Sequence, residues 1–509
     1  MRRLLRVFSR TPGNLAASVG LIAASYLFRL PPLWNARSTN SDAAVVGLQA
    51  MHILRGEHSP FLWGSGYQTS VDAYVAAAFF AVFGATPFVL MLSALSLHVL
   101  ATWLVFATLR RHFALSSALL LTAPLVFTPS SVHTYALYPP RQASLTLALA
   151  AFCALDRAAA RVPSRAWLFT GGLLSTLAVS ADPYPMLLVP LALFYAALVA
   201  PRRLLVTIGG CAVGLVPFLL LHRLAGAKSG PLGLTLDALG HHFDLLVSEC
   251  LPWALSYKVY FAHDVMDYQP WSAPLPVRVV QIAGALSVLV IVVYGLAAFF
   301  LRAVPVHLRR LGATGALTYP LAIGGFLVSV MVMDHFSMRY LAVLTLMLPF
   351  AAAPLAFALG PKRFAAFFAP HVMAAAIGGW VGYGPFVRGV VPLRETPELA
   401  DDYVLLDRLR ARGVDRAMAD YWTAYRLTLL HGEEVIVVPK NAAEDRYRPY
   451  RAQVRSAPVF AYVFDPGRSR EDLGDTRARL RERYPHVDEE RAGRLTVLFV
   501  AGHASESVP

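Results

Sequence analysis

Two aspartates, Asp42 and Asp72, lie about thirty positions apart in a polar stretch near the start of a strongly apolar chain, with Tyr67 between them. A carboxylate can remove the proton from an attacking hydroxyl, while a nearby arginine or lysine stabilises a departing phosphate. These residue types therefore favour transfer of a group from a phosphate-bearing donor to a hydroxyl acceptor.

Acids, cations and tyrosines recur at the ends of later apolar segments. The candidate substrate-binding residues are Tyr67, Arg141, Asp182, Lys258, Arg339 and Tyr340. An ionisable side chain at the end of a membrane helix can also simply extend into the interface, so each candidate has a structural alternative. Taken together, they predict a site built at one surface of a membrane.

The elements that must position these residues are membrane helices. The chain of 509 residues is 57% hydrophobic and only 15% charged, whereas a soluble protein is about one-quarter charged. Its mean hydropathy is +0.53. Apolar runs of about twenty residues recur as far as Tyr383, and each is long enough to cross roughly 30 Å of hydrocarbon as a helix. We therefore expect an α-helical polytopic membrane protein.

The formal net charge of +14 comes mostly from arginines in short loops between apolar runs. That distribution encodes orientation in a bilayer and speaks against nucleic acid as a partner. We assign the N-terminal arginines to the cytoplasm and change the side of the membrane at each apolar run. This assignment predicts a plasma (inner) membrane protein with a cytoplasmic N-terminus and an outer C-terminus. About eleven spans are expected, at about 14–30, 87–109, 115–133, 142–156, 166–181, 186–200, 204–222, 278–301, 313–333, 340–360 and 364–384.

Composition divides the chain into two domains. Residues 1–392 form the predicted transmembrane domain, with a first outer loop at 31–86 and a long outer loop at 223–277. In residues 393–509, polar helices alternate with the apolar runs "VIVVP", "VFAYVF" and "LTVLFVA", which are typical of buried strands. We expect a small extracytoplasmic α/β domain that shapes access for the acceptor.

Both aspartates also have structural interpretations. Asp42 precedes the helical pattern "AAVVGLQAMHILRG" and is a good N-cap residue, while Asp72 lies where a helix dipole favours an anion. The His241-His242 pair has no metal-ligand spacing, so a solvated polar face is its simpler interpretation. The residues alone leave the catalytic and structural roles of the aspartates open.

Several short motifs resemble the GT-C glycosyltransferases, the polyprenyl-phosphate-sugar-dependent group that includes protein mannosyltransferases and lipid A aminoarabinose transferases. The stretch "GSGYQTSVDA…FG" resembles their first outer loop: Gly64, Tyr67 and Gly84 agree, and Asp72 stands for a glutamate. "RYLAVLTLMLPF" resembles the start of a late helix in these enzymes, and "ADYWTAYRLTLLHGEEVIV" the opening of their small outer domain.

The resemblance implies an inverting transfer of a sugar from a polyprenyl-phosphate donor to an extracytoplasmic lipid, glycan or protein acceptor, with Asp42 as the general base. Arg339, in its "RY" context, would hold the departing phosphate. A divalent metal stays possible as a cofactor, although the acid pair often seen at the first site is Asp42-Ala43 here, a departure that speaks against metal use.

Two other classes of function compete with the enzyme. A polytopic transporter or flippase usually has internal repeats and charges inside its helices, and this sequence has no such repeat. A non-catalytic cell-envelope assembly protein would have the same membrane architecture without depending on Asp42.

Overall fold

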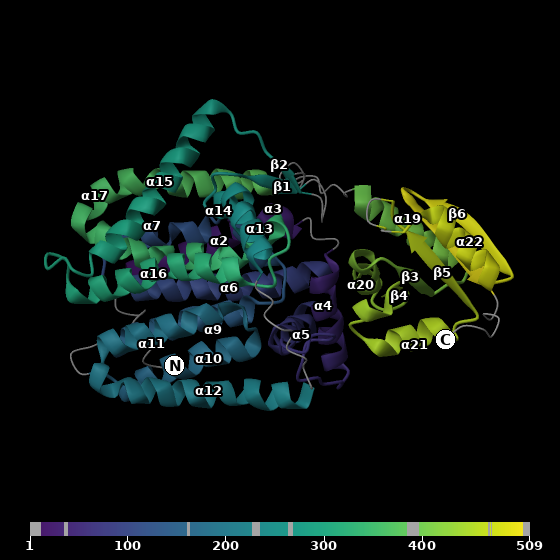
Figure 1. The fold of residues 1–509 in the computed structure, drawn as a ribbon, viewed down its shortest axis with the longest axis horizontal. Helices are drawn as coiled ribbons and strands as arrows, with labels where there is room; N and C mark the ends of the chain where they lie inside the picture. Colours follow the sequence, from purple (N-terminus) through teal and green to yellow (C-terminus); the bar gives the residue numbers. More distant parts are fainter. Residues whose placement is uncertain are drawn as a thin grey trace.

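The computed structural model describes residues 12–34, 39–159, 163–225, 235–262, 268–383, 397–466, 469 and 471–501. Long helices form a bundle, and a mixed sheet with its own helices lies beyond one end of it (Figure 1). Helices α4 (Ser41–Leu54) and α5 (Val71–Phe83) of the first loop lie between the two (Figure 1). The N-terminal arginines of the predicted cytoplasmic end and the predicted domain boundary after residue 392 lie outside the described residues.

Helices occur at each segment that the sequence predicts to span the membrane. They are α2 (Pro12–Phe28), α6 (Pro87–Leu109), α7 (Leu115–Val126), α8 (Ser130–Leu137), α9 (Gln142–Ala158), α10 (Arg165–Ala181), α11 (Leu188–Val199), α12 (Leu204–Ala225), α15 (Leu275–Ala297), α16 (Val306–Val328) and α17 (Ala342–Gly382). The short helix α3 (Leu30–Trp34) follows α2. Helix α17 is kinked at Gly360, whose φ of +72° suits only glycine comfortably, between the two spans predicted there.

Length and hydropathy together single out the strongest membrane segments. In the described part of the chain, five helical segments can cross a bilayer by these criteria: Pro87–Leu109, Pro201–Leu220, Leu275–Ala297, Val306–Val328 and His335–Gly382. Shorter apolar helices occupy Gly13–Phe28, Val71–Phe83, Leu115–Val126 and Tyr184–Val199. The chain is thus a polytopic helical membrane protein, while the number of eleven crossings stays a prediction.

Glycines allow the closest helix contacts in the bundle. A Cβ atom on Gly172 would lie 2.0 Å from the Thr207 carbonyl oxygen, so α10 and α12 can approach each other this closely only because the side chain is missing. On the opposite side of the bundle, a Cβ on Gly315 would meet the Ala351 backbone nitrogen at 2.3 Å, which fixes α16 against α17 in the same way.

The described part of the long loop at 223–277, which the sequence predicts to be an outer loop, folds back onto the segment that carries Arg339. It contains α13 (Leu236–Leu245), a π-helical turn at Leu246–Cys250, α14 (Leu251–Ala254) and the short strands β1 (Tyr260–Ala262) and β2 (Tyr268–Pro270). The Tyr260 ring stacks on His335 with centroids 5.4 Å apart. His335 opens the 3-10 helix η4 (His335–Leu341), so the loop buttresses this helix.

The C-terminal region contains a five-stranded sheet in the order β4-β3-β5-β7-β6. Strand β3 (Arg416–Ala419) pairs in parallel with β4 (Ile436–Pro439) and β5 (Val459–Phe464). Strand β7 (Leu495–Ala501) pairs antiparallel with β5 and with the edge strand β6 (His486–Ala492). The helices are α19 (Pro397–Ala411), α20 (Tyr421–Leu430), the 3-10 helix η5 (Ala442–Glu444), α21 (Arg448–Ser456) and α22 (Leu473–Arg483). The apolar runs predicted as strands are β4, β5 and β7.

The first loop and the C-terminal region share one hydrophobic core. Helix α20 packs on α4, and the buried side chains of Tyr425 and Leu429 join those of the first loop in this core. A Cβ on Gly47 would already lie 3.0 Å from Leu429, so the glycine brings the two helices close together. The Ser41 hydroxyl donates to the Tyr421 carbonyl at 2.6 Å, which joins the starts of both helices.

Candidate functional site

Asp42 lies in the first turn of α4, where the side chain is 39% exposed. The N-cap is Asn40, whose side chain accepts the Ala43 N–H at 2.9 Å, so Asp42 is not the capping residue. The Tyr421 hydroxyl donates to Asp42 Oδ1 at 2.5 Å. Among the described residues, the other oxygen, Oδ2, has no recorded hydrogen bond. One oxygen is thus held while the second remains available to accept a proton.

Arg446 joins the same group from the loop after β4. Its guanidinium donates to the Tyr421 hydroxyl at 3.0 Å and lies 3.8 Å from Asp42 Oδ1. Burial would lower the pKa of Arg446, but the neighbouring Tyr421 and Asp42 outweigh it and raise this pKa. Burial first, and then the Asp42 charge, raise the pKa of Tyr421, so its hydroxyl stays protonated and donates.

Gly64 of the first loop is shaped for this contact. Its φ of +65° is in the left-handed region, and its carbonyl accepts from Arg446 Nη1 at 3.1 Å. A Cβ on Gly64 would lie 2.5 Å from Arg446 Cδ and 2.7 Å from its Cα, which leaves no room for any other residue. The motif glycine therefore brings the first loop onto the C-terminal region.

A pocket of about 380 Å³ opens beside Tyr421 and Arg446, the two residues that contact Asp42. Its lining residues are Gly64, Asp420, Tyr421, Trp422, Ala443, Glu444, Asp445 and Arg446. A pocket of this volume is large enough for a small ligand. The pocket thus lies next to the two residues that hold Asp42.

A second group forms around Asp182, which is only 3% exposed and follows α10. Arg141 Nε donates to Asp182 Oδ2 at 3.2 Å, and the Gln68 amide donates to the same oxygen. The Tyr184 backbone N–H donates to Oδ1 at 2.7 Å. Because the Thr69 N–H also donates to the Ala181 carbonyl at 3.0 Å, the first loop is fastened directly to this turn.

Arg141 and Arg339 converge on Tyr340 from different elements. The Arg141 guanidinium lies 5.9 Å from the Tyr340 ring centroid, and the Arg339 guanidinium lies 5.2 Å from it. The Tyr184 hydroxyl donates to the Arg339 carbonyl at 2.7 Å, and the Tyr184 and Tyr340 rings are 5.9 Å apart. Two arginines beside tyrosine rings can bind a phosphate through charge-assisted hydrogen bonds.

Tyr67 connects the two groups. Burial is the main reason why the pKa of its hydroxyl is raised, and the charges of Arg141, Asp182 and Arg446 also act on it. The residue as a whole is 42% exposed, while its hydroxyl is close enough to Arg141, Asp182 and Arg446 to be affected by their charges. Of the three predicted first-loop residues, Asp42 and Tyr67 thus both lie near Arg446, while Asp72 is bonded to the start of α9.

Asp72 is 7% exposed, and both of its oxygens accept backbone N–H groups at the start of α9. The Arg141 N–H donates at 3.1 Å and the Ala143 N–H at 3.2 Å. Burial raises the pKa of Asp72 to about 6, against the opposing effect of these two bonds. The Asp72 carboxylate thus fixes the backbone of Arg141 next to Asp182 and Tyr340. The φ of Arg141 is +103°, which is unusual for a residue other than glycine.

Lys258 belongs to a neighbouring cluster. Its ammonium pairs with Glu249 at 2.7 Å and lies 5.8 Å from the Tyr260 ring, which in turn stacks on His335. The structure does not bring Lys258 into contact with Arg141 or Arg339 among the described residues. It reaches the arginine group only through η4.

Metal-ligating side chains are sparse around Asp42. Its neighbours are the Tyr421 hydroxyl and the Arg446 guanidinium, which do not form the oxygen-rich set that a divalent cation prefers. Within the described ranges, no group of three or more His, Cys, Asp or Glu side chains is arranged to hold a metal ion. The predicted option of a divalent metal therefore finds no ligand set here.

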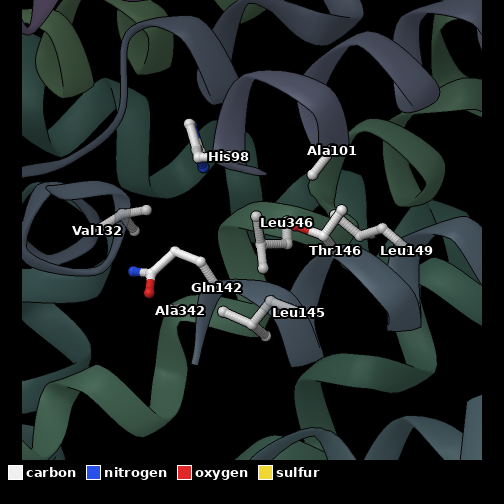
Figure 2. Close-up of a pocket in the computed structure, with 9 residues that line it drawn as sticks. All are labelled: His98, Ala101, Val132, Gln142, Leu145, Thr146, Leu149, Ala342 and Leu346. Carbon is white, nitrogen blue, oxygen red and sulfur yellow. The ribbon is translucent and has the colours of Figure 1, made fainter. Parts of the chain in front are cut away.

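A second cavity lies inside the helical bundle (Figure 2). Its volume is about 20 Å³. Most of the side chains around it are apolar, and the polar ones are His98, Gln142 and Thr146. A cavity of this size has room for about one water molecule and is too small for a sugar. It is therefore no alternative to the outer pocket as a substrate site.

Sequence reasoning missed Tyr421, Arg446 and Gln68 as members of the site. Tyr421 stands in the "ADYWTAYR" segment, and Gln68 follows the motif residue Tyr67, so both lie in stretches that the motif analysis singled out. Arg446 begins the run "RYRPYRAQVR", which indicates either a basic aromatic patch for lipid headgroups or acceptor glycan or, more simply, a solvated face, and neither interpretation places Arg446 beside Asp42.

No family model and no curated protein sequence matches the chain. Among solved structures, the chain is similar to ArnT from Cupriavidus metallidurans bound to undecaprenyl phosphate, at 12% identity and a TM-score of 0.49, covering 98% of this chain and 100% of that one. It is similar to the Archaeoglobus fulgidus oligosaccharyltransferase at 11% identity and a TM-score of 0.46, covering 88% and 67%. For the arabinofuranosyltransferase AftD from Mycobacteria the identity is 14% and the TM-score 0.48, covering 100% and 40%.

These three solved proteins are members of the GT-C superfamily, the group that the sequence motifs resemble. At identities of 11–14% and TM-scores below 0.5, the similarities assign no activity to this chain.

Proposed function

We propose that this protein is a membrane glycosyltransferase that moves a sugar from a polyprenyl-phosphate donor to an acceptor hydroxyl on the outer face of the membrane. The observation that carries the proposal is the arrangement around Asp42: Tyr421 fixes one carboxylate oxygen, the other accepts no hydrogen bond from the residues that the structure describes, and a pocket opens beside Tyr421. The paired arginines at Tyr340 support a phosphate site on the same face.

In the proposed reaction, the acceptor oxygen attacks the anomeric carbon of the sugar and Asp42 Oδ2 takes the hydroxyl proton. The bond between the anomeric carbon and the phosphate oxygen breaks, and its electron pair leaves with the polyprenyl phosphate. A single displacement of this kind inverts the anomeric configuration. Tyr421 and Arg446 position Asp42 for the step, and neither needs to change its protonation state.

Arg339 is the proposed ligand of the departing phosphate. Negative charge grows on the phosphate as the bond breaks, so a fixed guanidinium stabilises the transition state more than the ground state. We assign Arg141 a second, weaker contact, because Asp182 already takes part of its charge. Asp72 acts as a positioning residue that holds Arg141 through its backbone.

The proposed topology is that of the sequence analysis: eleven crossings, a cytoplasmic N-terminus and an outer C-terminal domain in the plasma membrane. Glu444 is exposed at the pocket, and Arg302 is exposed in the turn between α15 and α16. In intact cells, an impermeant thiol reagent should modify Glu444→Cys and not Arg302→Cys, in a background without the three native cysteines. The reverse pattern would refute the orientation.

The two competing functions make different demands on the same residues. A flippase has to move a charged headgroup through the bundle, whereas the groups assembled around Asp42 and Tyr340 come from outer loops and from the C-terminal region. A non-catalytic assembly protein would have no need of an aspartate with one oxygen held and the other available. Only the glycosyltransferase should release polyprenyl phosphate from a donor, so a measurement of turnover distinguishes it from the two competing functions.

The deciding experiment is a transfer assay with the full-length protein in nanodiscs. A panel of polyprenyl-phosphate sugars is supplied, and free polyprenyl phosphate is quantified. General-base assistance is commonly worth about 10²–10⁴ in rate, so Asp42→Asn should reduce turnover by roughly that factor. Asp475→Asn, which changes an exposed aspartate in the first turn of α22, is the matched control and should not reduce turnover.

Two results would contradict the proposal. If the wild-type protein released polyprenyl phosphate from no donor in the panel, the glycosyltransferase assignment would be wrong. If Asp42→Asn retained the wild-type rate, the protein would still be an enzyme, but Asp42 would not be its general base.

A further inference from the structure

The pocket beside Tyr421 lies where parallel strands of the C-terminal sheet end. Asp420 and Trp422 follow β3, and Glu444 and Arg446 follow β4. From β3 the chain goes to β4 on one side of the sheet and then to β5 on the other, so strand order reverses at β3. Ligands of open α/β sheets bind at the carboxyl ends of the strands near such a reversal.

We propose that this pocket binds the acceptor, and that the acceptor presents a neutral, hydroxyl-rich sugar ring there. This inference rests on the proposed function, because it names the molecule whose hydroxyl Asp42 deprotonates. The pocket is connected to Asp42 through Tyr421 and Arg446, which line it and contact the carboxylate. A ring bound here can place one hydroxyl toward Asp42.

The charges around the pocket favour a neutral ligand. Asp445 pairs with Arg451 at 2.8 Å, and Asp420 lies 3.7 Å from Lys440. Arg446 is already directed toward Asp42 and Gly64. No excess of positive charge is then left for a phosphate, and the exposed Glu444 carboxylate would repel one.

The remaining groups suit a sugar. Trp422 is 37% exposed at the start of α20, so part of its indole is available to pack against the C–H face of a ring. The Glu444 carboxylate can accept hydrogen bonds from two neighbouring hydroxyls. A volume of about 380 Å³ accommodates a single ring with part of a second or an attached group.

The inference is tested by saturation-transfer NMR on the full-length protein in nanodiscs, without donor. The probes are methyl glycosides of glucose, galactose, mannose and arabinose, with glucose 6-phosphate as the anionic comparison. At least one neutral glycoside should give a transfer signal. Trp422→Ala and Glu444→Gln should each weaken its binding by about tenfold, as truncation of an anchoring contact commonly does.

Tyr403→Ala is the control, because Tyr403 is exposed on α19 away from the pocket residues. Thermal unfolding of each variant confirms that it is folded, and Glu444→Gln keeps the size of the side chain. The inference is wrong if no neutral glycoside binds, if only glucose 6-phosphate binds, or if binding is unchanged in both pocket variants.

Donor hydrolysis separates a failure of this inference from a failure of the proposed function. If the pocket binds the acceptor only, the wild-type protein should release polyprenyl phosphate slowly with water as acceptor, and a bound neutral glycoside should change this release. Glycoside binding without any donor turnover in the wild type would leave the sugar pocket standing and refute the transferase. Turnover that is unaffected by both pocket variants, for every acceptor tried, would refute the pocket.

Discussion

The Tyr421 hydroxyl and the Asp42 carboxylate meet at 2.5 Å although 379 positions separate them in the chain. Asp42 lies in the first turn of α4 in the first loop, and Tyr421 is the first residue of α20 in the C-terminal region. Ser41 bonds the backbone of Tyr421 at the same point. The C-terminal region therefore completes the candidate site and is not only a cover over it.

Removing the Tyr421 hydroxyl should slow the reaction without abolishing it. A hydrogen bond to a charged group is worth about 1.5–3 kcal/mol, so Tyr421→Phe should lower kcat/KM by roughly 10- to 100-fold. Tyr403→Phe, on the exposed surface of α19, should not change it. Transfer assays in nanodiscs measure kcat/KM for both variants. If Tyr421→Phe had the same kcat/KM as Tyr403→Phe, Tyr421 would not position Asp42.

Gly64 offers a test of the contact between the first loop and Arg446. Gly64→Ala and Gly56→Ala both place a side chain at positive φ, a strain of about 1–2 kcal/mol. Only at Gly64 would the new Cβ also meet Arg446, since nothing lies within 4 Å of the Gly56 position. Both variants should lose similar backbone stability, while Gly64→Ala alone should lose most of its turnover. Comparable activity in the two variants would contradict this account.

The two arginines beside Tyr340 should respond differently to substitution. Arg339→Ala should reduce kcat/KM for the donor by roughly 10- to 100-fold, and Arg339→Lys should restore only part of it, because a point charge lacks the planar fork. Arg141→Ala should instead lower the unfolding temperature, because it leaves the buried Asp182 without its recorded cation. Steady-state kinetics and thermal unfolding of all three variants are compared.

Arg302→Ala, in the turn between α15 and α16, is the control for a lost arginine far from the site. The phosphate assignment of Arg339 fails if the alanine variant uses the donor as well as the wild type does.

His52 holds the first loop to the C-terminal region in a manner that depends on pH. Its two ring nitrogens lie 2.6 Å from Glu57 and 2.6 Å from Glu433. Burial would lower the pKa of His52, but hydrogen bonds to Glu433 and Glu57 outweigh it and raise this pKa above 6.5. Burial would raise the pKa values of the two glutamates, but their bonds to His52 outweigh it and lower them below 4.5.

The sign of the effect follows from these directions. A raised His52 pKa stabilises the folded state fully below about pH 6.5, and this contribution disappears as the pH rises through the higher folded pKa. The glutamates stabilise the fold above about pH 4.5, and their contribution is lost as the pH falls through the lowered pKa values. The His52 cluster should therefore be strongest between about pH 4.5 and 6.5.

Thermal unfolding in nanodiscs measures this directly. The difference between the wild type and His52→Gln should be largest near pH 5.5 and should shrink as the pH rises toward 9. His486→Gln, at an exposed position that begins β6, should show no such trend. A difference that stays constant over this range would mean that folding does not raise the pKa of His52.

The sequence by itself determined the helices and most of the buried strands. A membrane helix requires a long unbroken apolar run, and a buried strand requires a short run of branched and aromatic residues, so both leave a local pattern. Strands β4, β5 and β7 followed that rule, while the edge strand β6 reads "HVDEERA" and carries too little apolar character to be recognised. The local pattern also predicted a helix that starts near Asp42, although it offered Asp42 as the N-cap, whereas the structure places it in the first turn of α4.

Only the tertiary structure decided which groups those aspartates meet. Asn40 caps α4 in place of Asp42, and Asp72 gives both oxygens to the start of another helix. Tyr421 and Arg446 reach Asp42 because α20 packs on α4 at Gly47, and Gly64 leaves room for the arginine. Hydrogen bonds between residues hundreds of positions apart depend on how helices pack, and no periodicity within one segment records that packing.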